Sequence, residues 1–98
     1  MNSHGHELHI TIYDKNNEKI SLNQRIDIRF FDRYLHELGI RPHIIGISDN
    51  FFFCIYRDRY KEKMYRCINK LNEKTIYMKY KGIVKFSVLE IICDKEFF

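Results

Sequence analysis

The chain has 98 residues and a formal net charge of +4; 45% of its residues are hydrophobic and 31% are charged. Eight phenylalanines and seven tyrosines supply enough apolar surface to exclude a disordered chain, and no apolar run reaches the about 18–20 residues that a membrane-spanning helix requires. We therefore expect one globular domain over residues 1–98, cytoplasmic and without a membrane partner. Cys54, Cys67 and Cys93 are odd in number and lack CxxC spacing, so reduced thiols are expected, two of them buried.

The first predicted element is a strand over residues 7–14, ELHITIYD. Leu8, Ile10 and Ile12 alternate with less apolar residues, which is the pattern of a strand with one buried face. The turn-forming sequence DKNNEK follows it. Residues 18–22 are then predicted to return as a short hairpin partner.

A helix is predicted from Ser21 to Gly39, where glycine favours a left-handed C-terminal cap. Ser21 and Gln24 fit a capping box at its start. Asn23 and Asp27 are alternative first residues. Its apolar face, at helical spacing, consists of Ile28, Phe31, Tyr34, Leu35 and Leu38, with Phe30 at the border.

Two strands joined by a tight turn are predicted next, over residues 40–48 and 50–56. Pro42 is expected at the beginning of the first strand or on a sheet edge, because proline cannot donate to a ladder. The second strand has two faces: Phe51, Phe53 and Ile55 on one, and Phe52, Cys54 and Tyr56 on the other.

A second helix is predicted over residues 58–72, with Asp58 as its N-cap. Its apolar stripe consists of Tyr60, Met64, Cys67, Ile68 and Leu71. Residues 74–94 are predicted to form two strands joined at Lys81 and Gly82. The alternative is one long strand with a bulge at Gly82.

This order of elements predicts an α+β fold with an antiparallel sheet of four to six strands and both helices on one face. Strand, helix, hairpin, helix and strand in that order are the ferredoxin-like arrangement. A β-grasp-like fold that uses the first hairpin is the alternative.

The run of three phenylalanines partly matches the octamer of the RNA-recognition motif, in which alternating aromatics on a sheet strand stack on bases. When that octamer is aligned with residues 49–56, aromatic residues fill its aromatic positions. Its basic position, however, holds Asp49 and its glycine position holds Asn50, and an acidic residue has the wrong charge for a phosphate. We therefore predict a core strand, with an exposed aromatic interaction face and base stacking as the alternatives.

Residues 31–71 contain a helix ending in the LxxxGI pattern (Leu35 to Ile40), a strand ending in IS, and an apolar strand that leads into a helix ending at Leu71. In these spacings the segment resembles the ACT regulatory domain of aspartate kinases. The resemblance implies a ferredoxin-like fold, and a site for an amino acid at a dimer interface, with a glycine-bearing loop after the first strand. Here that loop is DKNNEKISLNQ, residues 14–24, which contains no glycine.

His4, His6 and His9 lie close together in the sequence, but no acidic or cysteine partner stands at a metal-ligand spacing. We predict solvent-exposed polar residues and no metal site, with residues 1–6 as a flexible N-terminus. No nucleophile elbow, phosphate-binding glycine loop or paired-carboxylate motif is present, so an enzyme is not expected and no catalytic residue or cofactor is predicted.

Basic residues gather on the predicted outer face of the second helix, within about 60° of arc by the helical repeat. They are Arg59, Lys63, Arg66 and Lys70, and the first helix adds Arg25, Arg29 and Arg33 on its polar face. Like charges at this spacing repel, so the arrangement does not serve the stability of the helix itself. A partner-binding surface is predicted; a plain solvated face is the alternative, because Glu62, Asp32 and Glu37 interrupt it.

The predicted function is a small non-enzymatic binding or regulatory module that docks an acidic protein surface or nucleic acid through this basic helical face. Such a chain would suit an inhibitor encoded by a bacterium, a phage or another mobile element. The alternative function is an ACT-like domain that senses a small molecule and forms a homodimer through a sheet edge.

Overall fold

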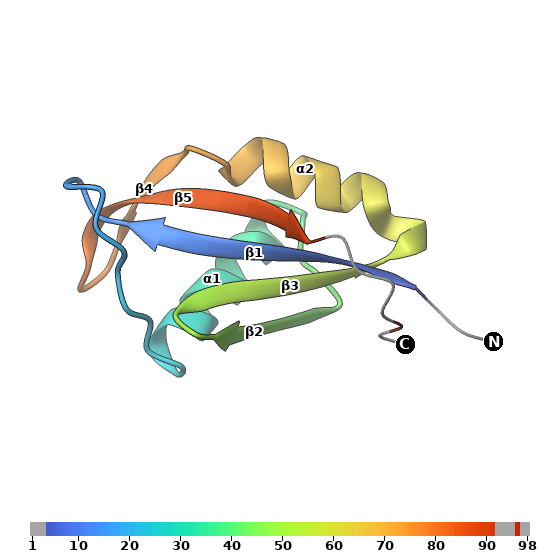
Figure 1. Ribbon diagram of the computed structural model, residues 1–98, viewed down its shortest axis with the longest axis horizontal. Helices are drawn as coiled ribbons and strands as arrows, with labels where there is room; N and C mark the ends of the chain where they lie inside the picture. Colours follow the sequence, from blue (N-terminus) through green and yellow to red (C-terminus); the bar gives the residue numbers. More distant parts are fainter. Residues whose placement is uncertain (1–3, 92–95, 97–98) are drawn as a thin grey trace.

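A computed structural model describes residues 4–91 and residue 96. Its elements in chain order are β1 (Gly5–Tyr13), α1 (Ile26–Glu37), β2 (Ile44–Ser48), β3 (Phe51–Arg57), the short 3-10 helix η1 (Asp58–Tyr60), α2 (Lys61–Leu71), β4 (Thr75–Met78) and β5 (Gly82–Ile91). The five strands form one antiparallel sheet in the order β2-β3-β1-β5-β4, so the first strand of the chain lies in the middle (Figure 1). The predicted α+β class and antiparallel sheet are confirmed.

Both helices pack on the same face of the sheet. On β3, the side chains of Phe52 and Tyr56 point to this inner face, in register with the buried face of β1. Phe31 of α1 stacks on Phe52 with ring centroids 4.0 Å apart. Cys67 of α2 contacts the Tyr56 side chain. The sheet is therefore covered on one side by two helices, which leaves the other side as an outer face.

The core lies between the helices and this inner face. Its fully or almost fully buried apolar residues include Leu8, Ile10 and Ile12 of β1, Phe52, Cys54 and Tyr56 of β3, Val84 and Phe86 of β5, and Phe31, Leu35, Met64, Cys67 and Leu71 of the helices. The alternation predicted for β1 is confirmed, and that of β3 holds except at Ile55, which is also buried. Cys54 and Cys67 are buried free thiols, as expected, and Cys93 lies outside the described residues.

The start of α1 differs from the capping box proposed for Ser21 and Gln24. The helix begins at Ile26, and the side-chain oxygen of Asn23 accepts hydrogen bonds from the main-chain N–H groups of Arg25 and Ile26. The capping-box prediction is wrong. Of the alternative starts, Asn23 supplies these hydrogen bonds, although the helix itself begins three residues later. Gly39 has φ +72° and ends the helix in the left-handed conformation, as predicted.

Asp27 is the one charged residue that is buried in the described part of the chain. Its carboxylate accepts a hydrogen bond from the main-chain N–H of Asn23 at 2.6 Å and lies 3.2 Å from the ammonium group of Lys81. Lys81 precedes β5, so this ion pair joins the first turn of α1 to the β4–β5 connection. A tertiary contact, in addition to the local cap, thus holds the start of the helix.

Asp58 does not cap the second helix. It lies in η1, and its carboxylate accepts a hydrogen bond from Nε2 of His6 at 2.7 Å, while α2 begins only at Lys61 and has no side-chain cap. The predicted N-cap is wrong because a residue distant in sequence binds the carboxylate. β1 correspondingly begins at Gly5, two residues before its predicted start, and includes His6.

Residues 18–22 form no strand. The main-chain N–H of Ile20 bonds to Ile12 and a single bridge joins Lys19 to Tyr13, on the side of β1 opposite β5, but no ladder continues from this bridge. The predicted first hairpin is therefore absent from the described residues. The β-grasp alternative depended on that hairpin. β4 and β5 are separate strands, as predicted, with Gly82 at φ +81°; residues 92–94 of the predicted segment lie outside the described residues. None of the described helices is long and apolar enough to cross a membrane.

Candidate functional site: a basic surface around Tyr60

Two of the predicted binding residues lie against one aromatic ring. The guanidinium carbon of Arg59 is 5.1 Å from the centroid of the Tyr60 ring, and the ammonium nitrogen of Lys63 is 5.2 Å from it. Arg59 belongs to η1 rather than to α2, so it does not continue the helical stripe. Lys63 was expected to point to solvent, but its side chain is half-buried beside the ring. The electron-rich face of the Tyr60 ring thus attracts both cations.

His43 joins this pair from another part of the chain. It precedes β2, and its ring centroid is 4.9 Å from that of Tyr60. Its Nδ1 accepts a hydrogen bond of 3.4 Å from the main-chain N–H of Arg57, at the end of β3. Because β2 pairs with β3, His43 lies beside the start of η1. We call the five residues His43, Arg57, Arg59, Tyr60 and Lys63 the Tyr60 cluster.

The Tyr60 cluster has a positive potential. Partial burial lowers the pKa of His43, and the charges of Arg57, Lys63 and Arg59 lower it further, in that order. Burial alone would lower the pKa in the same direction, and the positive charges of Arg57, Lys63 and Arg59 add to it because a neighbouring cation disfavours the protonated imidazole. An anion that reached the cluster would be attracted by the same field.

Lys70 and Arg66 occupy different environments. The ammonium group of Lys70 donates a hydrogen bond of 3.3 Å to the main-chain carbonyl of Leu38, just past the end of α1. A cation at this end of a helix also complements the helix dipole, so Lys70 has a structural role. Arg66 is exposed, and its side chain makes no hydrogen bond or ion pair within residues 4–91 and 96. Arg66 is therefore available to a partner.

The three arginines of the first helical face are all exposed. Arg25 directly precedes α1, and Arg29 and Arg33 lie on the helix opposite its buried residues Phe31 and Leu35. Their expected exposure is confirmed. They form a second basic area, separate in the chain from the Tyr60 cluster.

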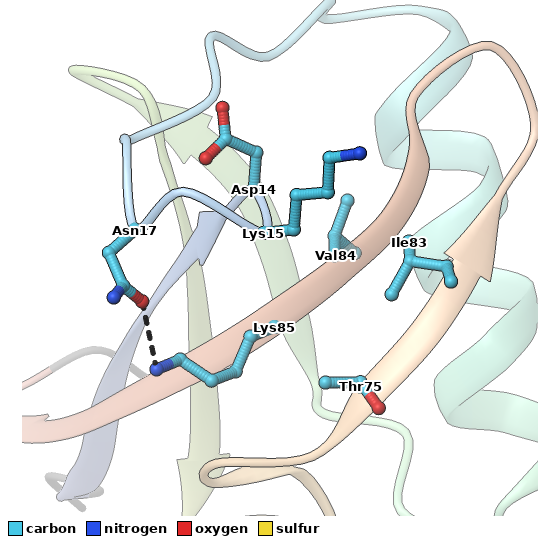
Figure 2. Close-up of a pocket in the computed structure, with 7 residues that line it drawn as sticks. All are labelled: Asp14, Lys15, Asn17, Thr75, Ile83, Val84 and Lys85. Atoms are coloured by element: carbon cyan, nitrogen blue, oxygen red, sulfur yellow. Dashed lines mark hydrogen bonds between the residues drawn. The ribbon is translucent and has the colours of Figure 1, made fainter.

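The loop after β1, where the ACT resemblance implied a ligand site, lines a pocket of about 200 Å³. Figure 2 shows its lining residues, which are Asp14, Lys15, Asn17, Thr75, Ile83, Val84 and Lys85. The ammonium group of Lys85 donates a hydrogen bond of 3.3 Å to the side-chain oxygen of Asn17. The carboxylate of Asp14 accepts hydrogen bonds from the main-chain N–H groups of Asn16 and Glu18, which fixes the loop. The pocket thus combines one carboxylate with two amines.

The phenylalanine run divides between two faces of the sheet. Phe52 is fully buried in the core, whereas Phe51 and Phe53 are half-buried on the outer face. Phe51 stacks on His9, with ring centroids 4.2 Å apart, and the ring of Phe53 lies over Gly46. The prediction of a core strand is confirmed for the inner residues.

The N-terminal histidines do not converge. His6 binds Asp58 and His9 stacks on Phe51, and no group of three metal-ligating side chains gathers in the described part of the chain. Comparison with known proteins found no matching family model, no matching curated protein and no matching solved structure.

Proposed function

We propose that the protein is a small non-enzymatic binding module that docks an acidic surface, on a protein or a nucleic acid, through the Tyr60 cluster and Arg66. The observation that carries this proposal is that Arg59 of η1 and Lys63 of α2 converge on one tyrosine ring beside His43, whose pKa is lowered by burial and by neighbouring cations. Like charges held together in this way repel one another. A carboxylate or phosphate would relieve that repulsion.

The chemistry of these side chains favours an anion with several oxygens. Arginine presents a planar fork of donors that pairs bidentately with carboxylate or phosphate, and Arg59 and Arg66 are both exposed. Lys63 adds a point charge held beside Tyr60. Such a surface suits a regulator or inhibitor, whose work is to occupy an acidic site on another molecule.

We also propose that the fold is ferredoxin-like with one strand added. The chain order β1-α1-β2-β3-α2-β5 and the sheet order β2-β3-β1-β5 support this assignment. β4 is the added strand, and it extends the sheet beyond β5. This arrangement leaves both helices, and the Tyr60 cluster beside α2, accessible from one side.

The test is a pair of double charge reversals with the same change in net charge. Arg59→Glu with Arg66→Glu reverses two exposed arginines of the proposed surface, whereas Lys74→Glu with Lys79→Glu reverses two exposed lysines beside β4. Binding to single-stranded DNA, duplex DNA and polyglutamate is measured by fluorescence anisotropy at low and high salt. We expect the first variant to bind its preferred polyanion roughly ten-fold or more weakly, and the second to bind as the wild type does.

Two further results test the assignment of polyanion binding to the Tyr60 cluster. Wild-type binding should weaken as salt rises, because the Debye length falls below about 10 Å above 0.1 M. Equal affinities for the two reversal variants would show that only net charge matters, and the assignment to the Tyr60 cluster would be wrong.

A second candidate function is the sensing of a small molecule such as an amino acid. The pocket beside residues 14–17 favours it, because the Asp14 carboxylate suits an ammonium group and the amines of Lys15 and Lys85 suit a carboxylate. Titration of the free amino acids, followed by NMR chemical shifts, tests it. Lys85→Met should abolish such binding, and the reversal of Arg59 and Arg66 should leave it intact.

A further inference from the structure

We propose that the outer edge of β2 pairs with the same edge of a second copy of the chain, around a two-fold axis at Gly46. β2 is an end strand of the sheet, so one side of its backbone has no neighbouring strand among the described residues. Its sequence, IIGIS, contains no charged residue and no proline. Natural edge strands are normally protected by such residues, so an unprotected edge indicates a pairing surface.

The opposite edge of the sheet differs. β4 has only four residues, and Lys74 and Lys79 flank it directly. Lysines at an edge are one of the devices that prevent edge-to-edge pairing, and it is these lysines rather than length that distinguish β4, because β2 has only five residues. The two edges of the same sheet are therefore distinguished by their own residues, and β2 is the one suited to association.

The hairpin geometry determines which backbone groups of β2 face outward. Asp49 and Asn50 have φ of +47° and +66° and form a two-residue turn that closes at Ser48 and Phe51. In such a hairpin the closing pair exchanges hydrogen bonds, and hydrogen-bonded pairs then alternate along the strands. Ile45 and Ile47 consequently direct their N–H and C=O groups away from β3.

With a two-fold axis at Gly46, the outward N–H and C=O groups of Ile45 and Ile47 find hydrogen-bond partners in the second copy. Ile45 of each copy then lies opposite Ile47 of the other, and each of the two pairs exchanges two hydrogen bonds. Gly46 lies opposite Gly46 in a pair without hydrogen bonds, where the Cα atoms approach to about 4.5 Å. Glycine suits this close approach, and a Cβ at residue 46 would also lie 2.3 Å from Cζ of Phe53.

The charges at the ends of β2 are complementary under the same axis. His43, before the strand, comes opposite Asp49 of the second copy, after the strand. Asp49 is exposed, and the surroundings of His43 are positive because of Arg57, Lys63 and Arg59. The symmetry repeats this attraction at both ends, and no like charges face each other within the paired strands. A second copy is therefore the occupant that this edge fits.

The test compares Ile47→Pro with Ile47→Ala in the full chain by sedimentation equilibrium. Both variants lose the isoleucine side chain, but only proline lacks the outward N–H group, and an edge strand tolerates proline at such a position. We expect a concentration-dependent dimer for the wild type and for Ile47→Ala, and a dimer weakened roughly ten-fold or more for Ile47→Pro. Circular dichroism spectra and melting curves identify a variant that fails to fold.

A second variant keeps the proposal testable if proline disturbs the strand. Asp49→Asn removes the negative charge and retains a residue that accepts the left-handed conformation, so it should weaken the dimer and reduce its dependence on salt. A wild type that stays monomeric at every concentration overturns the proposal. So does a dimer that neither Ile47→Pro nor Asp49→Asn weakens. Polyanion binding, measured on the same variants, tests the Tyr60 cluster separately.

Discussion

The hydroxyl group of Tyr56, on β3, donates a hydrogen bond to the main-chain carbonyl of Ile40, in the segment that leads from α1 to β2. Both residues are fully buried, and the Tyr56 side chain also contacts Cys67 of α2. One polar group in the core thus connects the sheet with the end of one helix and the middle of the other. Because the carbonyl is away from water, the loss of its donor carries a cost.

Tyr56→Phe should lower the free energy of unfolding by about 1–3 kcal/mol, because it leaves the Ile40 carbonyl buried without its partner. Urea unfolding followed by circular dichroism measures the change. The matched control is Tyr65→Phe on α2, where the tyrosine is 43% exposed and should tolerate the loss of its hydroxyl. Equal stability of the two variants would contradict the role assigned to the Tyr56 hydrogen bond.

Phe52→Ala should destabilise the protein by about 3–5 kcal/mol, because it removes a fully buried ring that stacks on Phe31. Phe51→Ala, the same change at the preceding residue, removes a half-buried ring from the outer face and should cost less. The two urea midpoints, measured together, decide the assignment of faces. The reverse order of midpoints would show that the strand presents its other side to the helices.

Lys81→Met should cost about 3 kcal/mol, because the Asp27 carboxylate would lose its ionic partner while it remains buried. Lys79→Met, two residues earlier, changes an exposed lysine and serves as the control. Thermal melting compares them. A melting temperature for Lys81→Met as high as that of the control would mean that Asp27 is satisfied by its main-chain contact alone.

Stability should decline as the pH rises above 9. Burial raises the pKa of the Cys67 thiol from 9.0 to about 11, and it also raises the pKa of Cys54 and of the Tyr56 hydroxyl. Between pH 9 and about 11 the unfolded chain releases the Cys67 proton and the folded chain retains it, so deprotonation favours unfolding. The contribution is complete below pH 9, and its loss approaches about 1.4 kcal/mol per pH unit for each such group.

Urea midpoints at a series of pH values across this window measure the decline. Cys67→Ala removes one of the titrating groups and should flatten the curve relative to the wild type. A wild-type midpoint that stays constant through the window would contradict the burial of the thiols.

Most of the elements could be predicted from the sequence because their apolar residues repeat with a clear period. Leu8, Ile10 and Ile12 mark one face of β1, and their burial follows from the alternation. The start of α1 was harder to predict, because Ser21 and Asn23 are both residue types that favour the N-cap position. The contacts of Asp27 with Asn23 and Lys81 favour the observed start of α1. The contact with Lys81 joins residues that are far apart in the sequence.

The candidate site was predicted only in part, because it too depends on contacts between residues that are distant in the sequence. The helical repeat identified Lys63 and Arg66, and both belong to the basic surface. It assigned Tyr60 to the apolar stripe and did not include His43, which reaches the ring only because β2 pairs with β3. The repeat also includes Lys70, whose partner, the main-chain carbonyl of Leu38, lies just past the end of the other helix, α1. Periodicity describes one element at a time and carries no information on contacts between elements.

The central place of β1 has a consequence for the order of events during synthesis. Ile10 pairs with Phe52 on one side and with Val88 on the other. While the chain grows on the ribosome, the β2–β3 and β4–β5 hairpins and the two helices can form from neighbouring residues. The pairing of β1 with β5, in contrast, can form only after β5 has been synthesised. Contacts so distant in sequence slow folding, and until they close, the apolar inner face of β1 lacks one of its partners. β5, the last of the described strands to emerge, therefore completes the pairing of β1, and a ribosome that pauses before Val88 would leave that side of β1 accessible to chaperones and proteases.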